Sequence, residues 1–299
     1  MIKNGLSPRF AEIGKIKIGG KGEVRKSKDG KDYRLPVRYE HFVVTTTEKG
    51  GDDNFIIDNK IMKLLGQEPK EIPIRLPFDD IDLNFYTSFQ YYVGKKCACR
   101  GDGESAIRIG NDGVEKKVVC NPDECEFMKT EKCKVSGILS AHIPLSMEIG
   151  GVYRFRTHSW NSVSSILAAL KYFSDNTNGV LQNLPLKLKF LKKSTQDHGN
   201  VNIVTVVLDG IELMKMRELA FAEYENRMKL GIDMKGIENQ AKQLGFTEDT
   251  DDPADVEAEY YPPTIDASQV EAGKSATDVT EELKKPEQKI EPKKEGDLL

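Results

Sequence analysis

Residues Asn84–Val93, NFYTSFQYYV, are rich in aromatic and β-branched side chains along their whole length. If the segment is extended, its odd-numbered residues, from Phe85 to Val93, share one face. The even-numbered residues, from Tyr86 to Tyr92, share the other. Because aromatic and β-branched residues favour a pleated surface, the segment predicts a long strand that belongs to a sheet.

Similar runs predict further strands on both sides of this segment. They lie at 42–47, 72–78, 138–143, 152–157, 186–191 and 201–208. Pro73 and Pro77 indicate an edge position for the strand at 72–78, because proline has no N–H to donate to a neighbour. The last two runs are expected to form a hairpin. The first forty residues predict a twisted β arm with a turn at Asp29-Gly30.

Helical periodicity is strongest at Asn161–Thr177, where apolar residues recur at the spacing of a core-facing stripe. A shorter helix is expected between a cap at Asp58 and a stop at Gly66, with Ile61, Leu64 and Leu65 on one face. Two more helices are expected near 211–230 and 234–244. The predicted fold class is α+β, with a largely antiparallel multi-stranded body at 1–209 and C-terminal helices at 210–246.

The segment 247–299 differs from the rest of the chain in composition. It contains sixteen Asp and Glu and six Lys, a net charge of −10. The whole chain carries −4, so residues 1–246 carry +6. The segment has few large apolar residues, so it cannot bury enough surface to offset the entropy of ordering. We expect a disordered acidic tail that contributes nothing to the core but is attracted to the body in a salt-dependent way.

All five cysteines lie between Cys97 and Cys133. Their spacing is Cys97-x-Cys99-x20-Cys120-x4-Cys125-x7-Cys133. Four thiolates can surround Zn²⁺ in a closed shell, and a glycine-rich segment with little apolar packing needs such stabilisation. We therefore predict a structural zinc site in an inserted loop at 97–134.

Spacing alone leaves open which four of the five cysteines bind the metal. Cys97 is favoured as the one left out, because only one residue separates it from Cys99. A set of ordinary buried or free thiols is the alternative interpretation.

No catalytic motif is complete in this sequence. The segment Lys15-x4-Gly20-Lys21-Gly22 lacks the first glycine and the Ser or Thr of a phosphate-binding loop. Asp79, Asp80 and Asp82 are a candidate Mg²⁺ site, but a solvated loop after an edge strand explains them at least as well. We predict that the protein is not an enzyme, with a metal-dependent nuclease or hydrolase as the least favoured alternative.

The N-terminal arm suggests a second kind of partner. Nine Lys or Arg fall between Lys15 and Arg38. Tyr86 and Tyr92, on the second face of the strand at 84–93, are placed to stack on bases while the arm 15–38 follows the phosphates of DNA. Packing beneath a loop, or anchoring a protein partner, would explain the two tyrosines equally well.

Several short motifs resemble a known family over about residues 7–209. They are Pro8-Arg-Phe, Gly14-Lys-Ile, Val43-Val-Thr-Thr, Leu64-Leu-Gly, Cys99-Arg-Gly-Asp-Gly-Glu-Ser-Ala, Cys120-Asn-Pro-Asp-Glu-Cys125-Glu-Phe, Cys133-Lys-Val-Ser-Gly-Ile-Leu and Phe155-Arg-Thr-His-Ser-Trp-Asn-Ser. The sequence resembles the recombination-directionality-factor-like proteins of phages and mobile elements, which are often labelled metal-binding. The segment 247–299 is outside this resemblance.

The resemblance implies a role in site-specific recombination. Such proteins bind a large serine integrase and turn its preferred direction toward excision, by contacting the integrase and without performing chemistry or needing DNA contacts of their own. The resemblance also implies Cys99, Cys120, Cys125 and Cys133 as the zinc ligands and leaves Cys97 out. A nucleic-acid-binding protein of phage replication, recombination or transcription is the alternative function.

No stretch approaches the roughly 20 apolar residues that a membrane helix requires. The N-terminal residues lack the apolar run of a signal peptide. We expect no membrane association and a location in the cytoplasm of a bacterial host, a reducing compartment in which clustered cysteines more often bind metal than form disulfides.

Overall fold

The computed structural model describes residues 10–26, 32–51, 54–93, 96–110, 113–148, 150–195, 199–246, 249 and 251–260. The chain divides into a main unit, residues 1–22 and 35–262, and a small second unit, residues 23–34 and 263–299. Of the second unit, residues 23–26 and 32–34 are described, and they are the end of strand β1 and the start of β2. All other elements belong to the main unit.

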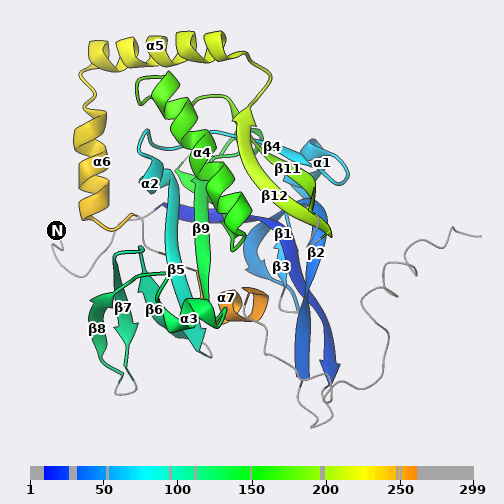
Figure 1. Ribbon diagram of the computed structural model, residues 1–299. Coiled ribbons are helices and arrows are strands. Elements are labelled where there is room, and N and C mark those ends of the chain that lie inside the picture. The colour runs from blue at the N-terminus through cyan, green and yellow to red at the C-terminus, as the bar shows by residue number, and fades with distance from the viewer. Residues whose placement is uncertain are drawn as a thin grey trace, which may run out of the picture. The chain divides into compact units, whose positions relative to one another are not determined.

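The described residues form one large sheet with the spatial order β3-β2-β1-β10-β9-β5-β6-β7-β8 (Figure 1). The strands are β1 Ala11–Lys26, β2 Asp32–Lys49, β3 Phe55–Ile57, β5 Phe85–Val93, β6 Lys96–Gly101, β7 Ser105–Ile109, β8 Glu115–Val119, β9 Cys133–Ala141 and β10 Gly151–Thr157. Pairing is antiparallel from β10 to β8, whereas β1 runs parallel to β10. The predicted α+β class with a mostly antiparallel sheet is confirmed, and β1 and β10 add a parallel pair to it.

A second, three-stranded sheet has the order β12-β11-β4. Its strands are β4 Glu71–Ile74, β11 Leu186–Thr195 and β12 Gly199–Leu208. The predicted hairpin is β11 and β12, paired antiparallel along their whole length. β4 lies at the edge, as Pro73 predicted.

Helix α4, Trp160–Asn176, matches the strongest helical prediction. Ser159 caps it, since its hydroxyl oxygen accepts a hydrogen bond from the N–H of Ser162 at 3.3 Å. Its stripe of Val163, Ile166, Leu170 and Phe173 is buried, as the spacing predicted. These residues pack in one core with the buried side chains of both sheets, so α4 joins the two sheets.

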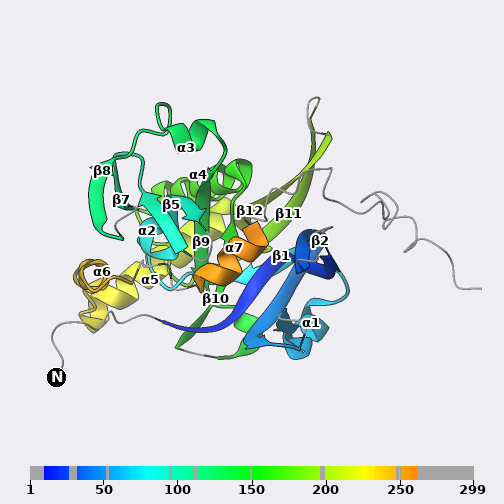
Figure 2. The same cartoon turned by 90° about the horizontal axis from the view of Figure 1, so that it is seen from below.

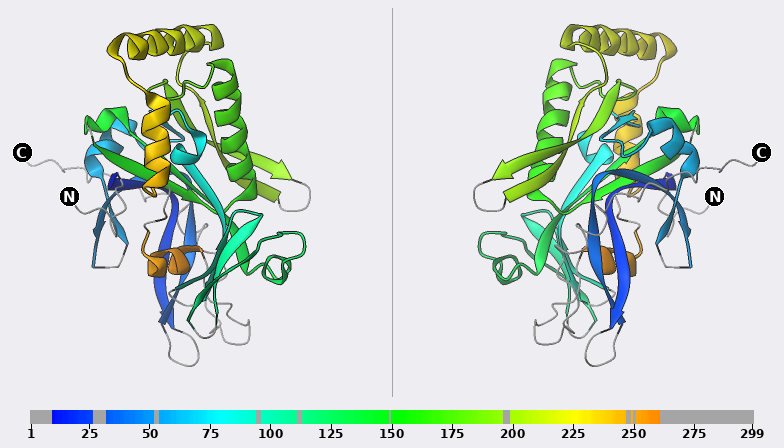
Figure 3. Two further views of the ribbon diagram at one scale, coloured as in Figure 1. Left: turned by 90° about the vertical axis from the view of Figure 1, so that its left-hand side faces the viewer. Right: turned by 90° about the vertical axis from the view of Figure 1, so that its right-hand side faces the viewer.

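The other helices are short or lie late in the chain. They are α1 Asn59–Leu65, α2 Ile81–Asn84, α3 Glu126–Lys129, the 3₁₀ turn η1 Pro144–Ser146, α5 Leu213–Leu230, α6 Met234–Gln243 and α7 Pro253–Tyr260. Asp58 caps α1 as predicted, but Leu64 is 62% exposed, so the predicted apolar face of α1 is wrong at that position. The two helices expected near 211–244 are α5 and α6, and α5 lies across one end of α4 (Figure 3).

The segment 97–134 differs from the expected glycine-rich loop. Strands β6, β7 and β8 extend the main sheet, and α3 follows them. Backbone pairing with β5 and among β6, β7 and β8 orders this region, although its composition offers little apolar packing.

The segment 247–299 also differs from the prediction, over the part that the structure describes. Residues 253–260 form helix α7, which lies against the large sheet beside β1 (Figure 2). Val256 is only 2% exposed, so the expectation of disorder is wrong for residues 253–260. Residues 261–299 lie outside the described residues.

Asp79 fixes the connection between β4 and α2 to distant parts of the chain. Its carboxylate accepts hydrogen bonds from the N–H groups of Leu181 and Gln182, at 2.9 and 2.8 Å. It also pairs with Arg227 of α5, whose side chain is 7% exposed. Next to it, Glu238 of α6 accepts bonds from the N–H groups of Asp79 and Asp80. These contacts fasten α5 and α6 to the body.

We predict that Asp79→Asn lowers the free energy of unfolding by about 2 kcal/mol, because a hydrogen bond between charged groups loses one of its charges. Glu71→Gln is the control, since Glu71 pairs with Lys187 and Lys189 at the surface, where its side chain is 39% exposed. Chemical denaturation should show less than about 1 kcal/mol for the control. Equal effects of the two substitutions would contradict this role of Asp79.

Candidate functional site: a basic sheet face and a cysteine cluster

One face of the main sheet is lined with basic side chains at the period of two that strands impose. On β10, the sequence VYRFRT turns Tyr153 and Phe155 into the core and places Arg154 and Arg156 on the opposite face. Both arginines are buried, at 6% and 7% exposure. The basic face, as named here, consists of Lys15, Lys17 and Lys21 of β1, Lys49 of β2, Arg100 of β6, and Arg154 and Arg156 of β10.

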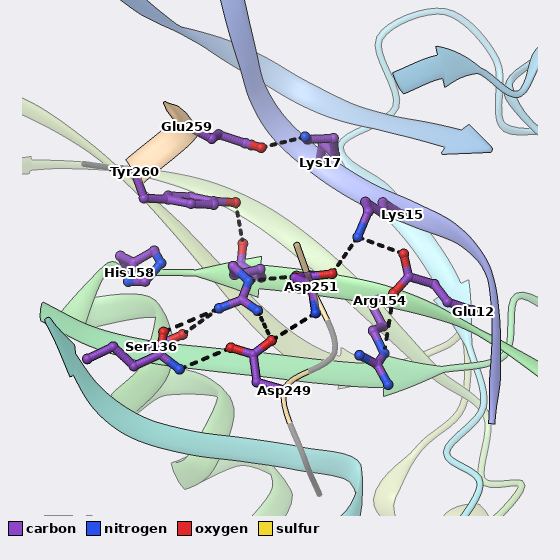
Figure 4. Close-up of polar contacts among 12 residues, drawn as sticks. Glu12, Lys15, Lys17, Ser136, Arg154, His158, Asp249, Asp251, Glu259 and Tyr260 are labelled. Atoms are coloured by element: carbon purple, nitrogen blue, oxygen red, sulfur yellow. Dashed lines mark hydrogen bonds and ion pairs between the residues drawn. The ribbon is translucent and has the colours of Figure 1, made fainter. Parts of the chain in front are cut away.

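An acidic segment, Asp249 and residues 251–260, covers this face (Figure 4). Asp251 lies between Lys15, at 2.5 Å, and Arg156, at 2.8 Å. Asp249 pairs with Arg156 and, at 3.5 Å, with Arg100. Each of these carboxylates therefore contacts two cations from strands that are far apart in sequence.

Helix α7 continues the same pattern with residues four positions apart. Asp255 pairs with Lys21 at 3.2 Å and with Lys49 at 2.8 Å. Glu259 pairs with Lys17 at 2.6 Å. Since Asp255 and Glu259 are four positions apart in the helix, they point to one side, toward the sheet.

Two uncharged side chains, Val256 and Tyr260, anchor the acidic segment. Val256 is buried. The ring of Tyr260 lies 4.4 Å from that of His158, and its hydroxyl group donates to the carbonyl oxygen of Arg156 at 3.4 Å. The Lys134 ammonium group donates to the carbonyl oxygen of Tyr260 at 2.8 Å. The end of α7 is therefore held by both apolar and polar contacts.

The charges of this interface reinforce each other. Burial opposes ionisation of Asp251, but the nearby charges of Arg156 and Lys15 lower its pKa well below the ordinary value. Burial similarly disfavours the Arg156 cation, but Asp249 and Asp251 raise its pKa. Burial, followed by the charge of Arg156, lowers the pKa of His158 to about 3, so this ring is neutral near pH 7. Asp251 is thus held ionised beside the charged guanidinium group of Arg156.

The tyrosines singled out from sequence have different surroundings. Tyr92 is 6% exposed, and burial, with Asp249 nearby, raises its pKa to about 12. Of the two interpretations of Tyr92, packing beneath another segment describes this structure, because Asp249 of the acidic segment lies near Tyr92 and contacts Gln90 on the same face of β5. Tyr86 is half-buried and lines a surface hollow together with Arg100 and Lys117.

Of the predicted basic arm 15–38, the lysines at 15, 17 and 21 belong to the basic face. Lys28 and Lys31 lie outside the described residues. Sequence reasoning missed Lys49, Arg154 and Arg156. It expected an acidic tail attracted to the body, but not an ordered helix docked on this face. The alternation of Arg with Tyr and Phe in β10 was the signal for a charged face.

Strand pairing brings the cysteines toward one patch of the sheet. Cys99 of β6 and Cys133 of β9 both lie opposite Tyr91, one on each side of β5. Cys120 lies against Gly101, where an added Cβ would come within 2.6 Å of its sulfur. Cys125 immediately precedes α3, whose Phe127 stacks on Tyr91 at 4.6 Å.

The four thiols influence one another. Burial, and then the charges of Cys125, Cys99 and Cys120, raise the pKa of Cys133 to about 12. A hydrogen bond to the Cys99 sulfur raises the pKa of Arg108. Among the described residues, however, no three His, Cys, Asp or Glu side chains lie close enough together to hold a metal ion.

Cys97 lies apart from this patch for a local reason. The register between β5 and β6 shifts after Tyr91, which faces Cys99, so that Tyr92 faces Cys97 and Ala98 is the extra residue of a bulge. A bulge reverses the alternation of side chains along a strand. Cys97 therefore lines the same hollow as Tyr86 and Arg100.

The acidic triplet has structural partners. Asp79 binds Arg227 and two backbone N–H groups, as described above. Asp80 caps α2 and pairs with Lys242 at 2.5 Å, and Asp82 lies 3.9 Å from the same ammonium group. The ion pairs of these aspartates fasten α5 and α6 rather than lining an open cavity.

Comparison with known proteins places the chain in a family. Residues 13–212 match the family described as Gp3-like: Recombination directionality factor-like. No curated protein and no solved structure matches the chain. No helix within the described ranges combines the length and apolar character needed to cross a bilayer. Because the match covers about two thirds of the sequence, from β1 to the end of the β11–β12 hairpin, the chain belongs to the recombination directionality factor-like family, which indicates a phage recombination-related accessory protein.

Proposed function

We propose that this protein binds a large serine integrase through protein contacts and shifts recombination toward excision. It acts in the cytoplasm of the bacterial host and performs no chemistry itself. Membership of the family is the observation that carries this proposal. The ion pairs and helix cap made by Asp79 and Asp80 support a role without catalysis, since they account for these carboxylates structurally.

An exposed apolar stripe on α5 supports a protein partner. It consists of Met214, Phe221, Tyr224 and Met228, which are 61%, 64%, 47% and 64% exposed. Their spacing places them on one side of the helix. Apolar groups concentrated in this way mark protein interaction sites, and aromatic residues often dominate the binding energy.

The opposite side of α5 is held by the body. Met216 and Ala220 are buried in the main core, and Arg227 pairs with Asp79. The stripe is therefore presented on a fixed helix, and little conformational entropy is lost when a partner binds. We assign it as part of the integrase-binding surface.

The proposal includes a structural zinc ion held by Cys99, Cys120, Cys125 and Cys133. The residues fit such an ion in chemistry, because four thiols from β6, β9 and the segment between them approach one patch of the sheet. Gly101 leaves the space that the Cys120 sulfur occupies. The ion would fasten the β6–β8 extension to the body.

Recombination assays test the integrase proposal. With the serine integrase of the same mobile element, this protein should stimulate recombination between the two hybrid sites that flank an integrated element. Phe221→Ser combined with Met228→Ser should weaken integrase binding and this stimulation at least about tenfold, because two anchors are lost. Binding is measured by surface plasmon resonance and recombination by product formation.

The matched control is Leu64→Ser combined with Met147→Ser, two apolar residues exposed elsewhere, at 62% and 89%. It should leave binding and stimulation unchanged. A wild-type protein that neither binds the integrase nor alters its direction would refute the function. An α5 variant indistinguishable from the control would refute the assigned surface alone.

Metal analysis tests the zinc proposal. Protein purified without chelator should contain about one zinc per chain, and Cys125→Ser should lose it, because three thiolates no longer close the shell. Cys97→Ser is the control and should keep the metal. A wild-type zinc content near zero, by elemental mass spectrometry, would show that the cysteines have another role.

A further inference from the structure

The basic face concentrates cations from several strands on one side of the main sheet. Lys15, Lys17 and Lys21 extend along β1, and Arg154 and Arg156 lie on the neighbouring β10. The ring of Phe55 lies among them, 5.1 Å from the Lys15 ammonium group and 4.9 Å from that of Lys17. Without its cover, this surface would combine a row of cations with an aromatic ring.

Some of these cations are held in place by the body itself. Arg156 donates to the Ser136 hydroxyl oxygen at 3.2 Å and lies 3.5 Å from the side-chain oxygen of Gln90. Gln90 in turn lies 3.1 Å from the Ser88 hydroxyl group. This network belongs to β5, β9 and β10, so it does not require the acidic segment. The guanidinium group is thus positioned to bind an anion from outside the body.

The acidic segment meets this surface mainly with charge. Asp249, Asp251, Asp255 and Glu259 supply four carboxylates within eleven residues, and each pairs with a cation of the face. The clusters of buried apolar residues that form the core do not include Val256. The segment can therefore leave the face while the hydrophobic core stays intact.

We propose that the basic face is a binding surface for the phosphate backbone of a nucleic acid, and that the acidic segment is a built-in competitor for it. The carboxylates occupy positions that phosphate groups would take. A nucleic acid fits better than an acidic peptide, because it carries a charge at every nucleotide along an extended line and offers bases to an aromatic ring such as Phe55. This goes beyond integrase binding, which uses a different surface.

The covalent link between the acidic segment and the body determines how strongly the segment competes. Since it belongs to the same chain, its effective concentration near the face is on the order of millimolar, so weak ion pairs suffice to keep it docked at low ligand concentration. Added salt weakens its docking and phosphate binding together. The intact chain should therefore bind nucleic acid poorly until the segment is displaced.

The experiment removes the charges of the competitor while keeping its shape. The variant carries Asp249→Asn, Asp251→Asn, Asp255→Asn and Glu259→Gln in the full-length chain. Fluorescence anisotropy measures its binding to a labelled mixed-sequence DNA, as a single strand and as a duplex, over a range of KCl concentrations. We expect at least about tenfold tighter binding than for the wild-type chain at low salt.

A charge-matched control separates docking from a general change in net charge. Glu281→Gln, Glu282→Gln, Glu287→Gln and Glu291→Gln remove the same charge from the region beyond the acidic segment. This control should bind DNA nearly as the wild-type chain does. Equal tightening in both quadruple variants would refute competition by the acidic segment.

Substitutions on the face identify the contact surface. In the neutralised variant, Lys17→Ala and Lys49→Ala should each weaken DNA binding and reduce the slope of log K against log salt by about 0.7 to 0.9. Lys171→Ala is the control, because its side chain on α4 is 74% exposed and away from the basic face. An unchanged slope in the first two would place any DNA contact elsewhere and overturn the proposal.

Thermal unfolding followed by circular dichroism shows whether the quadruple variant is folded. A second variant keeps the test decisive if it is not. Val256→Ser removes the apolar anchor and keeps every charge, and it should also tighten DNA binding. The final probe is a peptide of residues 247–262 added in trans. If the Val256→Ser protein binds this peptide but neither form of DNA, the face is a site for acidic protein segments and the nucleic-acid assignment is wrong.

Discussion

Two arginines buried in the middle of the main sheet are the constraint on which the arrangement of this molecule depends. Arg154 and Arg156 alternate with core residues on β10, so folding of the strand places them on its other face. A buried charge without a partner is costly. Arg154 pairs with Glu12. Arg156 pairs with Asp249 and Asp251 and also contacts the polar side chains around it. A segment that is the most acidic part of the chain thereby becomes a layer of the structure.

Pairing of charged side chains also joins parts of the chain that are far apart in sequence. Lys15 lies 236 positions before Asp251 and contacts it directly. On another side of the body, Arg227 of α5 pairs with Asp79, and Glu238 and Lys242 of α6 bind Asp79 and Asp80. The family-matched body, residues 13–212, thus carries two additions of different chemistry, one attached through charge and one that presents apolar residues outward.

The elements that sequence predicted well are those with a local signal. β5, α4 and the β11–β12 hairpin follow from alternation, helical spacing and a cap, all of which depend on neighbours within a few residues. β6 to β8 were missed because their order comes from pairing at a sheet edge, which is a tertiary property. The order of α7 was missed because the cations that hold it lie far away in sequence. The β-bulge that turns Cys97 toward Arg100 gave no signal in the cysteine spacing.

The parallel pairing of β1 with β10 has a consequence for biosynthesis. Ala11 of β1 pairs with Gly151 of β10, so this side of β1 has no partner until 140 further residues have been made. An exposed strand edge invites pairing with other nascent chains, and lysines along such a strand oppose it by charge repulsion. Lys15, Lys17 and Lys21 place such charges along β1. The side chains that bind the acidic segment in the folded protein are therefore of the kind that opposes aggregation of an unfinished chain.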